Sequence, residues 1–335
     1  MPGTGGPVAS GAVHDLDVVG IGNALVDVIT HADDGFLVEQ GLVKGSMNLI
    51  DSERALSLYR AMGAGVEMSG GSAANTMTGI ASFGGRGAYI GKVADDQLGE
   101  VFAHDLRAEG VAYRNPLADV GVPTGRCLVL VTPDAQRTMN TFLGVSSTLG
   151  PEDVDEELVA SGSVVYLEGY LFDRPPSKEA YHKAAEVAHA AGGKVSLTLS
   201  DSFCVERHRS DFFELVEHKV DLLFANESEL LALYQVDDFD DALQAVRGHC
   251  EVAAITRGKA GSIVVSGDEV HVVGAHDVAQ VVDTTGAGDL YAAGFLYGWT
   301  HREPLADCAR LGSLAAAEVI VHVGARPLVP LRTLV

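Results

Sequence analysis

A run of small residues between two apolar stretches is where this chain could carry out chemistry. Val281-Val282 leads into Asp283-Thr284-Thr285-Gly286-Ala287-Gly288, and Asp289 and an apolar run of helical length follow. Glycine and alanine let the backbone approach a ligand closely, and a helix N-terminus presents unpaired N–H groups to an anion. Asp289 would place a carboxylate beside that anion. The stretch therefore predicts a phosphate site next to a group that can take a proton.

A second glycine turn and two polar positions near the first strand are candidates for binding a substrate. Gly70-Gly71 precedes a helical stretch that carries Asn75, whose amide can both donate and accept. Asn23 and Asp27 follow the first buried strand, and ligands of open α/β sheets gather outside the carboxyl ends of strands. A closely packed helix after Gly70-Gly71 and a turn or cap at Asp27 would explain the same residues without a ligand.

Acidic residues follow two later strands. Glu168 lies near the end of the strand expected at 163–169, and Asn226-Glu227-Ser228-Glu229 follows the strand at 220–224. Mg2+ favours one or two carboxylates together with substrate phosphates, so Glu229 could hold a hydrated magnesium ion. The same residues also fit a helix cap, in which Asn226 caps and Glu229 completes the box. Both interpretations stay open at this point.

The order of the elements predicts a mostly parallel sheet. Buried strands alternate with helices through 163–256, as in a sheet with helices on both faces. The alternation breaks at 125–144, which has the pattern of a hairpin, and at the glycine-punctuated segment 33–51. Such a pair of strands suggests a small antiparallel lid over a cleft. We expect one α/β domain over residues 13–335, with a discontinuous β lid from about 33–51 and 116–145.

The composition argues against nucleic-acid and membrane partners. The 335 residues carry a net charge of −23 and no basic stripe, and no apolar run reaches the roughly 20 residues that span a bilayer. Residues 1–12 are rich in Gly, Pro and Ala, so we expect a disordered leader, no signal peptide and a cytoplasmic protein. The four cysteines are far apart, unlike those of a zinc site or a disulfide framework. The G-x-x-x-x-G-K-[ST] pattern of P-loop NTPases does not occur.

Four motifs that occur together and in order are similar to those of a known kinase family. They are Gly70-Gly71-x-x-x-Asn75, Gly91-Lys92-Val93-Ala94-Asp95-Asp96, Asn226-x-x-Glu229 and Asp283-Thr284-Thr285-Gly286-Ala287-Gly288-Asp289. They resemble the signatures of the PfkB (ribokinase-like) carbohydrate and nucleoside kinases, over roughly residues 15–330. One departure is Ala94, where the family usually has glycine. Another is 198–203, where many sugar kinases carry Asp-x-Asn; with segment 41–47, it is closer to the bacterial adenosine-kinase-like branch.

The resemblance implies a fold and a reaction. The fold would be a ribokinase-like three-layer α/β/α arrangement with a mostly parallel central sheet and a small β lid. The reaction would be ATP-dependent phosphorylation of a hydroxymethyl group, which depends mainly on positioning and electrostatic stabilisation. Asp289 would be the general base, and backbone N–H groups of Gly286, Ala287 and Gly288 would form an anion hole for the transferring phosphoryl group. ATP and Mg2+ would be required, and K+ is a further candidate.

The resemblance also implies ligand contacts along the chain. Substrate contacts would come from Asn23, Asp27, Gly70, Gly71, Asn75, Arg137 and Glu168. Nucleotide contacts would come from Asn226, Thr256, Gly258 and Gly261, with Mg2+ held by Glu229 through water. A monovalent cation would lie, bound mainly by backbone carbonyls, among Asp283, Thr285, Val319, His322 and Gly324.

Three functions are compatible with these residues. The first is a kinase for an adenosine-type nucleoside, and the second is a sugar kinase of the ribokinase or fructokinase type. The third, a non-catalytic nucleotide or sugar sensor, would be expected to lose the base or the anion turn, and both are intact here. Phe36, Phe142, Leu143 and Phe172 could pack on a nucleobase or belong to the lid and core. An exposed lid edge could also pair two copies as a homodimer.

Overall fold

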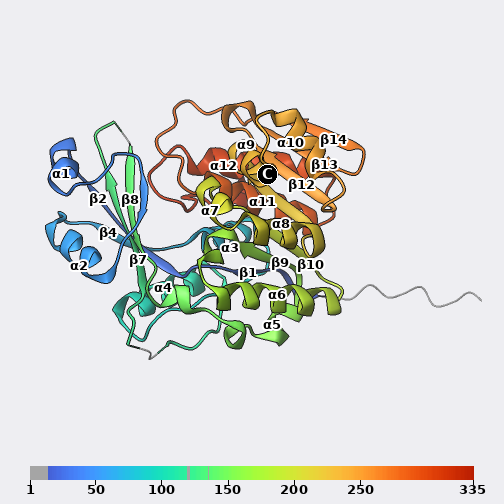
Figure 1. The fold of residues 1–335 in the computed structure, drawn as a ribbon. Coiled ribbons are helices and arrows are strands. Elements are labelled where there is room, and N and C mark those ends of the chain that lie inside the picture. Colours follow the sequence, from blue (N-terminus) through green and yellow to red (C-terminus); the bar gives the residue numbers. More distant parts are fainter. Residues whose placement is uncertain (1–13, 119–120, 135) are drawn as a thin grey trace, which may run out of the picture.

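The computed structural model describes residues 14–118, 121–134 and 136–335, so the leader expected at 1–12 lies outside the described residues. It contains a nine-stranded central sheet and a five-stranded sheet beside it (Figure 1). Helices cover both faces of the central sheet, and two short helices accompany the smaller one.

The central sheet is parallel except at one edge. Its strand order is β14-β13-β12-β11-β10-β9-β1-β5-β6, and the pairs β12–β13 and β13–β14 are antiparallel. Val19 and Ile21 pack against one helical layer and Val18 against the other, which is why these strands are continuous apolar runs. The strands are β1 (Leu16–Ile21), β5 (Gly87–Ile90), β6 (Ala112–Tyr113), β9 (Gly162–Glu168), β10 (Lys194–Thr198), β11 (Leu222–Asn226), β12 (Val252–Thr256), β13 (Ser262–Ser266) and β14 (Glu269–Val273).

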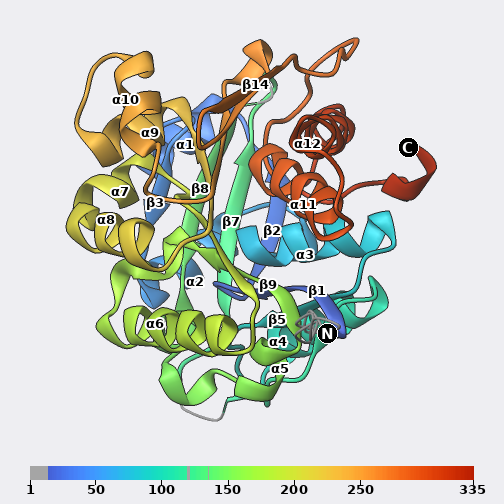
Figure 2. The ribbon, with the colours of Figure 1, turned by 90° about the vertical axis from the view of Figure 1, so that its right-hand side faces the viewer.

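Two helical layers bury separate apolar clusters on the two faces of this sheet. One layer contains α3 (Ser72–Phe83), α4 (Gln97–Ala108), α11 (Ala287–Thr300) and α12 (Leu305–Val319). The other contains α5 (Glu156–Ala160), α6 (Pro175–Ala190), α7 (Ser202–Arg207), α8 (Arg209–His218), α9 (Glu227–Tyr234) and α10 (Phe239–Val246). Figure 2 shows α11 and α12 on the opposite side from α6 and α8. Within the described ranges, no helix has both the length and the apolarity needed to cross a bilayer.

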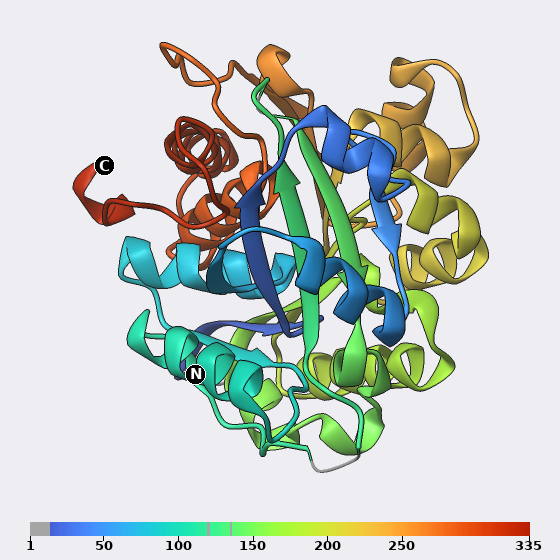
Figure 3. The same cartoon turned by 90° about the vertical axis from the view of Figure 1, so that its left-hand side faces the viewer.

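The five-stranded sheet has the strand order β3-β8-β7-β2-β4 and takes strands from both segments expected for the lid, so we call it the lid. Its outer face is covered by α1 (Asp34–Glu39) and α2 (Ser52–Ala61), the blue helices in front of the strands in Figure 3. Val28, Leu58 and Leu128 form a small core on that face, while Cys127 and Val129 belong to the opposite face. The strands are β2 (Leu25–His31), β3 (Met47–Leu49), β4 (Val66–Gly70), β7 (Gly125–Val131) and β8 (Arg137–Phe142).

Two of these strands lie outside the ranges expected for the lid, 33–51 and 116–145. β2 begins shortly after β1 and pairs with β7, and β4 pairs with β2. The partners of β2 lie tens of residues further along the chain, so the local pattern around it did not reveal the pairing. Asp27 therefore lies inside a strand of this sheet, and the alternative that it is a turn or cap residue is wrong.

Candidate active site

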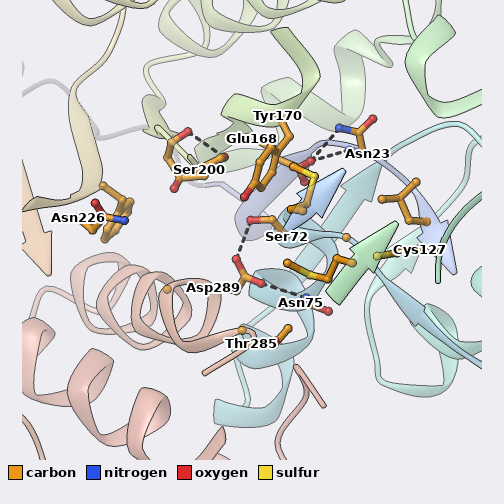
Figure 4. Close-up of a pocket in the computed structure, with 18 of the residues that line it drawn as sticks. Asn23, Ser72, Asn75, Cys127, Glu168, Tyr170, Ser200, Asn226, Thr285 and Asp289 are labelled. Atoms are coloured by element: carbon orange, nitrogen blue, oxygen red, sulfur yellow. Dashed lines mark hydrogen bonds between the residues drawn. The ribbon is translucent and has the colours of Figure 1, made fainter. Parts of the chain in front are cut away.

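A cavity of about 440 Å³ lies between the lid and the carboxyl ends of the central strands (Figure 4). Strand ends of a parallel sheet are where such folds place their ligands. The lid contributes Leu25, Asp27, Met47, Leu49, Cys127, Met139 and Thr141 to the lining. The central domain contributes Asn23, Glu168, Thr198, Asn226, Glu229, Thr256, Thr285, Gly286, Gly288 and Asp289.

Asp289 lies in the first turn of α11 and lines this cavity. Ser72 Oγ donates to its Oδ1 at 2.6 Å, and Asn75 Nδ2 donates to its Oδ2 at 3.0 Å (Figure 4). Each carboxylate oxygen has two lone pairs, so each can accept one more hydrogen bond. Burial raises the pKa of Asp289, while the hydrogen bonds from Ser72 and Asn75 and the charge of Arg326 lower it. A raised pKa suits a group that accepts a proton near neutral pH.

Two helix N-termini meet at this carboxylate. Ser72 and Asn75 lie in the first turn of α3, and Gly79 lies where α3 contacts α11. A Cβ at Gly79 would lie 2.6 Å from the Cβ of Ala293, so only glycine permits this close approach. The packing brings both donors to Asp289, and the partial positive charge of the two N-termini favours its ionised form.

The turn before α11 has the shape of an anion site. Gly286 is the N-cap with a φ of 78°, and a Cβ there would lie 2.8 Å from Ala325. A Cβ at Gly288 would meet nothing within 4 Å, so this side of the turn is open. The Ala287 N–H already donates to the carbonyl of Thr284 at 3.2 Å and thereby shapes the turn. Gly286 and Gly288 line the cavity, and Ala287 is not in the lining.

Asp27 is half-buried on the face of β2 that lines the cavity. A Cβ at Gly70 would lie 2.4 Å from Asp27 Oδ2, so the glycine makes room for the carboxylate. Burial raises the pKa of Asp27 to about 6, opposed by the charges of Arg326 and Arg137 and assisted by that of Asp289. The carboxylate therefore gains or loses its proton in a range where enzymes are commonly assayed.

Glu168 is only 1% exposed, and the protein itself occupies its oxygens. Oε1 accepts from the Asn23 backbone N at 3.2 Å and from Asn23 Nδ2 at 3.0 Å, and Oε2 accepts from Ala73 N at 2.8 Å. Burial raises the pKa of Glu168 to about 7, and these donors oppose the shift. The carboxylate thus links the ends of β1 and β9 to the start of α3. One of its donors, Asn23, is also a predicted substrate contact.

Asn226 and Glu229 form the helix cap that the sequence allowed. Asn226 Oδ1 accepts from the Glu229 backbone N at 2.9 Å, and Glu229 Oε2 accepts from the Asn226 backbone N at 2.9 Å. Glu229 Oε1 also accepts from Asn226 Nδ2 at 2.6 Å. Burial raises the pKa of Glu229 to about 7. Thr256 lies beside Asn226 on the neighbouring strand and also lines the cavity, whereas Gly258 and Gly261 do not.

The Asp283 carboxylate binds two backbone segments next to the anion turn. Its Oδ1 accepts from Thr285 N and its Oδ2 from Gly324 N, both at 3.0 Å. The same carboxylate forms an ion pair with Arg137 at the end of lid strand β8. Asp283, Thr285 and Gly324 are thus brought together, and Arg137 connects them to the lid.

The other two positions predicted around a monovalent cation are Val319 and His322. Val319 is buried in α12, and His322 Nε2 lies 3.4 Å from Glu318 Oε2. Across the part of the chain that the structure describes, no group of three or more His, Cys, Asp or Glu side chains could hold a metal ion.

Residues 47–332 match the family described as pfkB family carbohydrate kinase. The chain belongs to this family. The membership and the solved relatives confirm the resemblance and the ribokinase-like α/β fold. They also confirm the enzyme class, because PfkB kinases are phosphotransferases that act on hydroxyl groups of small molecules. An ATP-dependent family implies ATP, and usually Mg2+, as requirements.

Two bacterial solved structures are similar to this PfkB kinase over almost its whole length. The adenosine kinase from Sinorhizobium meliloti is 55% identical, with a TM-score of 0.90 over 95% of this chain and 98% of that one. A probable sugar kinase from Rhizobium etli CFN 42 is 49% identical, with a TM-score of 0.91 over 96% and 98%. The 5-dehydro-2-deoxygluconokinase of Geobacillus thermodenitrificans is 29% identical over 262 residues, which are 75% of this chain and 78% of that protein.

Most residues predicted for the site of this PfkB kinase surround the same cavity. Those in the lining are Asn23, Asp27, Gly71, Asn75, Glu168, Asn226, Thr256, Glu229, Thr285, Gly286, Gly288 and Asp289. Those outside it are Gly70, Arg137, Gly258, Gly261, Asp283, Ala287, Val319, His322 and Gly324. Of the four side chains considered for a nucleobase, Leu143 lines the cavity and Phe142 does not. Phe36 of α1 packs against the small core of the lid, and Phe172 lies in the main core.

Two polar residues that the sequence analysis did not assign contact the centre of the site. Ser72 donates to Asp289, and Arg326 Nε donates to Asn75 Oδ1 at 3.3 Å. Ser72 directly follows the glycine turn at the start of α3, which is a local signal that could have identified it. The contact of Arg326 joins residues 251 positions apart, and no motif marks it.

Proposed function

We propose that the protein is an ATP-dependent nucleoside kinase that phosphorylates the hydroxymethyl group of an adenosine-type substrate. The observation that carries the proposal is the position of Asp289 between two unlike halves of one cavity. The lid half combines the Asp27 carboxylate with apolar side chains. The other half combines polar strand ends with the Gly286–Gly288 turn. These halves fit a nucleoside and a triphosphate, with the base between them.

The lid half suits a flat apolar group better than a second set of hydroxyls. Met47, Leu49, Met139 and Leu143 line it, and Met47 and Leu49 remain 37% and 50% exposed. Covering apolar surface gains roughly 25 cal/mol per Å², which a nucleobase can supply and a free sugar cannot. The 55% identity to an adenosine kinase supports the same choice. The 49% identity to a probable sugar kinase is the reason to retain the sugar kinase as the alternative.

In the proposed reaction Asp27, Asn23, Asn75 and the backbone at Gly71 hold the ribose hydroxyls. Asp289 takes the proton of the hydroxymethyl group as its oxygen forms the new bond to the γ-phosphorus. The bond from that phosphorus to the bridging oxygen of ADP breaks, and ADP carries away the electron pair. The N–H groups of Gly286 and Gly288 stabilise charge on the transferring group, which is the main source of catalysis in phosphoryl transfer.

Asn226 and Thr256 are proposed to contact the nucleotide. Gly258 and Gly261, which do not line the cavity, would lie at the edge of the nucleotide site. Mg2+ would neutralise phosphate charge. Both Glu229 oxygens already accept hydrogen bonds from Asn226, so this carboxylate fits a metal held through water and not a direct ligand.

Two further proposals concern a potassium ion near the anion turn and a homodimer through the lid. Arg137 already pairs with the Asp283 carboxylate, so K+ would be bound by backbone carbonyls around Thr285, Val319, His322 and Gly324.

A second copy of the chain would pair along the edges of the lid sheet, where Val66 of β4 is 62% exposed.

ADP release measured over a panel of nucleosides and sugars tests the substrate class. We expect turnover with adenosine or a related nucleoside and little with ribose or fructose. Turnover with free sugars alone would replace the nucleoside by the sugar alternative. The absence of turnover across the whole panel would support the non-catalytic sensor.

The proposed role of Asp27 predicts a pH dependence of substrate binding. Its carboxylate accepts substrate hydroxyls when ionised, so KM for the nucleoside should rise as the pH falls through about 6. Above that pH the carboxylate is ionised, and Asp27 contributes no further change to KM. Protonation of Asp289 affects kcat instead, so separate pH profiles of KM and kcat distinguish the two groups. Asp27→Asn should give a higher KM that no longer changes near pH 6; a wild-type KM profile in this variant would contradict the assignment.

A further inference from the structure

Arg326 reaches the centre of the site from behind the cavity wall. It follows Gly324-Ala325 in the segment after α12, and its Nε donates to Asn75 Oδ1 at 3.3 Å. Asn75 and Asp289 line the cavity, whereas Arg326 does not. Its Nη2 atom is buried and has no hydrogen-bond partner among the residues that the structure describes. A ligand in the cavity would therefore meet Asn75 first, and Arg326 lies in the layer behind it.

The contact decides which way the Asn75 carboxamide points. A carboxamide has one accepting end and one donating end. Because Arg326 donates to the oxygen, the NH2 group faces the Asp289 carboxylate, 3.0 Å away. Rotated by half a turn, the amide would place its oxygen against that carboxylate and its NH2 group against the guanidinium. Both contacts would then be repulsive.

The charges around Arg326 keep this arrangement in place. Burial lowers the pKa of Arg326, and the carboxylates of Glu109, Asp27 and Asp105 raise it. These carboxylates come from β2 and from α4 and its end, so they surround the guanidinium from two elements. An arginine stays protonated even when partly desolvated, so its N–H groups can only donate. Asn75 therefore has a permanent donor on its oxygen side.

We propose that Arg326 is a positioning residue for phosphoryl transfer, which fixes the Asn75 carboxamide so that Asn75 and Ser72 together hold the Asp289 carboxylate. The inference rests on the proposed function, in which Asp289 is the general base. Arg326 does not line the cavity. Its positioning effect passes through Asn75 to the orientation of the base, and its charge acts separately on the pKa of Asp289 and Asp27.

A double-mutant cycle tests this chain of contacts. Arg326→Met keeps length and removes every donor, and at a pH well above 6 we expect kcat to fall by about 10- to 100-fold, with KM for ATP and nucleoside changed much less. Arg326→Lys restores a cationic donor and should recover part of the loss. In an Asn75→Ala background, Arg326→Met should change the pH-independent kcat, reached where Asp289 is fully ionised, by less than about threefold, because the side chain through which the positioning acts is gone.

Arg332→Met is the matched control, since Arg332 is exposed in the same C-terminal segment and is expected to leave kcat unchanged. Multiplicative effects of Arg326→Met and Asn75→Ala on kcat would overturn the inference, as would a large rise in KM at constant kcat. If Arg326→Met fails to fold, the Arg326→Lys pair in the wild-type and Asn75→Ala backgrounds carries the cycle. Full activity of Asp289→Asn would instead overturn the proposed function, so the two failures are distinguishable.

Discussion

Asp289→Asn is expected to lower kcat by roughly 10²- to 10⁴-fold, the range in which a positioned general base contributes. Asparagine keeps the size of the side chain and an oxygen that can accept from Ser72, but it cannot take a proton from a hydroxymethyl group. The nucleotide contacts at Asn226 and Thr256 are untouched. Binding of ATP, measured by calorimetry, should therefore stay close to that of the wild type.

The matched control for this variant is Asp155→Asn. Asp155 caps α5, where its carboxylate accepts from Leu158 N at 3.0 Å, and it is remote from the cavity lining. The control loses the same charge without altering the site, so its kcat should be unchanged. A kcat of Asp289→Asn within a few-fold of the wild type would refute the role of Asp289 as base.

Gly71→Ala is expected to damage both the fold and the reaction. Gly71 is the N-cap of α3 with a φ of 96°, and a Cβ there would lie 2.2 Å from the carbonyl oxygen of Asn23. The backbone strain alone costs about 1–3 kcal/mol, and the clash adds to it. Relief of the clash must move the start of α3, which carries Ser72 and Asn75. We therefore expect a lower free energy of unfolding in urea and a kcat reduced by at least about 10²-fold.

Gly84→Ala separates these two effects on the same helix. Gly84 ends α3 with a φ of 97°, almost the angle of Gly71, but a Cβ there would meet nothing within 4 Å. It should lose about 1–2 kcal/mol of stability through left-handed strain and keep the wild-type kcat. Equal losses of activity in the two alanine variants would show that the contact of Gly71 with Asn23 is not important for the site.

The parts of the site that the sequence predicts well are those built from neighbouring residues. The turn at 283–289 and the box of Asn226 and Glu229 are local motifs, in which the residue types themselves determine the backbone. Asp27 shows the limit of this reasoning. Its position along the chain was evident, but its place in a lid strand depends on pairing with β4 and β7.

Non-local contacts account for what the sequence left unassigned. Glu168 lies at a strand end, as predicted, yet its oxygens are used by Asn23 and Ala73 because three elements converge there. Arg326 acts on Asn75 across most of the chain length. Such partners are chosen by packing, and a single sequence holds no periodic or motif signal for them.

The three hydrogen bonds of Glu168 also tie the lid to the central domain. β2 leaves the central domain just after Asn23, and β4 returns to it just before Ala73. Both of these crossings are bound to the one buried carboxylate, and the chain crosses again before β7 and after β8. We therefore expect the lid to move least at this end of the cavity.

Asp27, the third residue of β2, lies close to these crossings. Arg137 pairs with Val131 at the opposite end of the lid strands. We therefore expect the ribose end of the cavity to change least when a ligand binds. The ion pair of Arg137 with Asp283 joins this far end of β8 to the loop before the anion turn, so the lid is tied to the central domain at both ends of its strands.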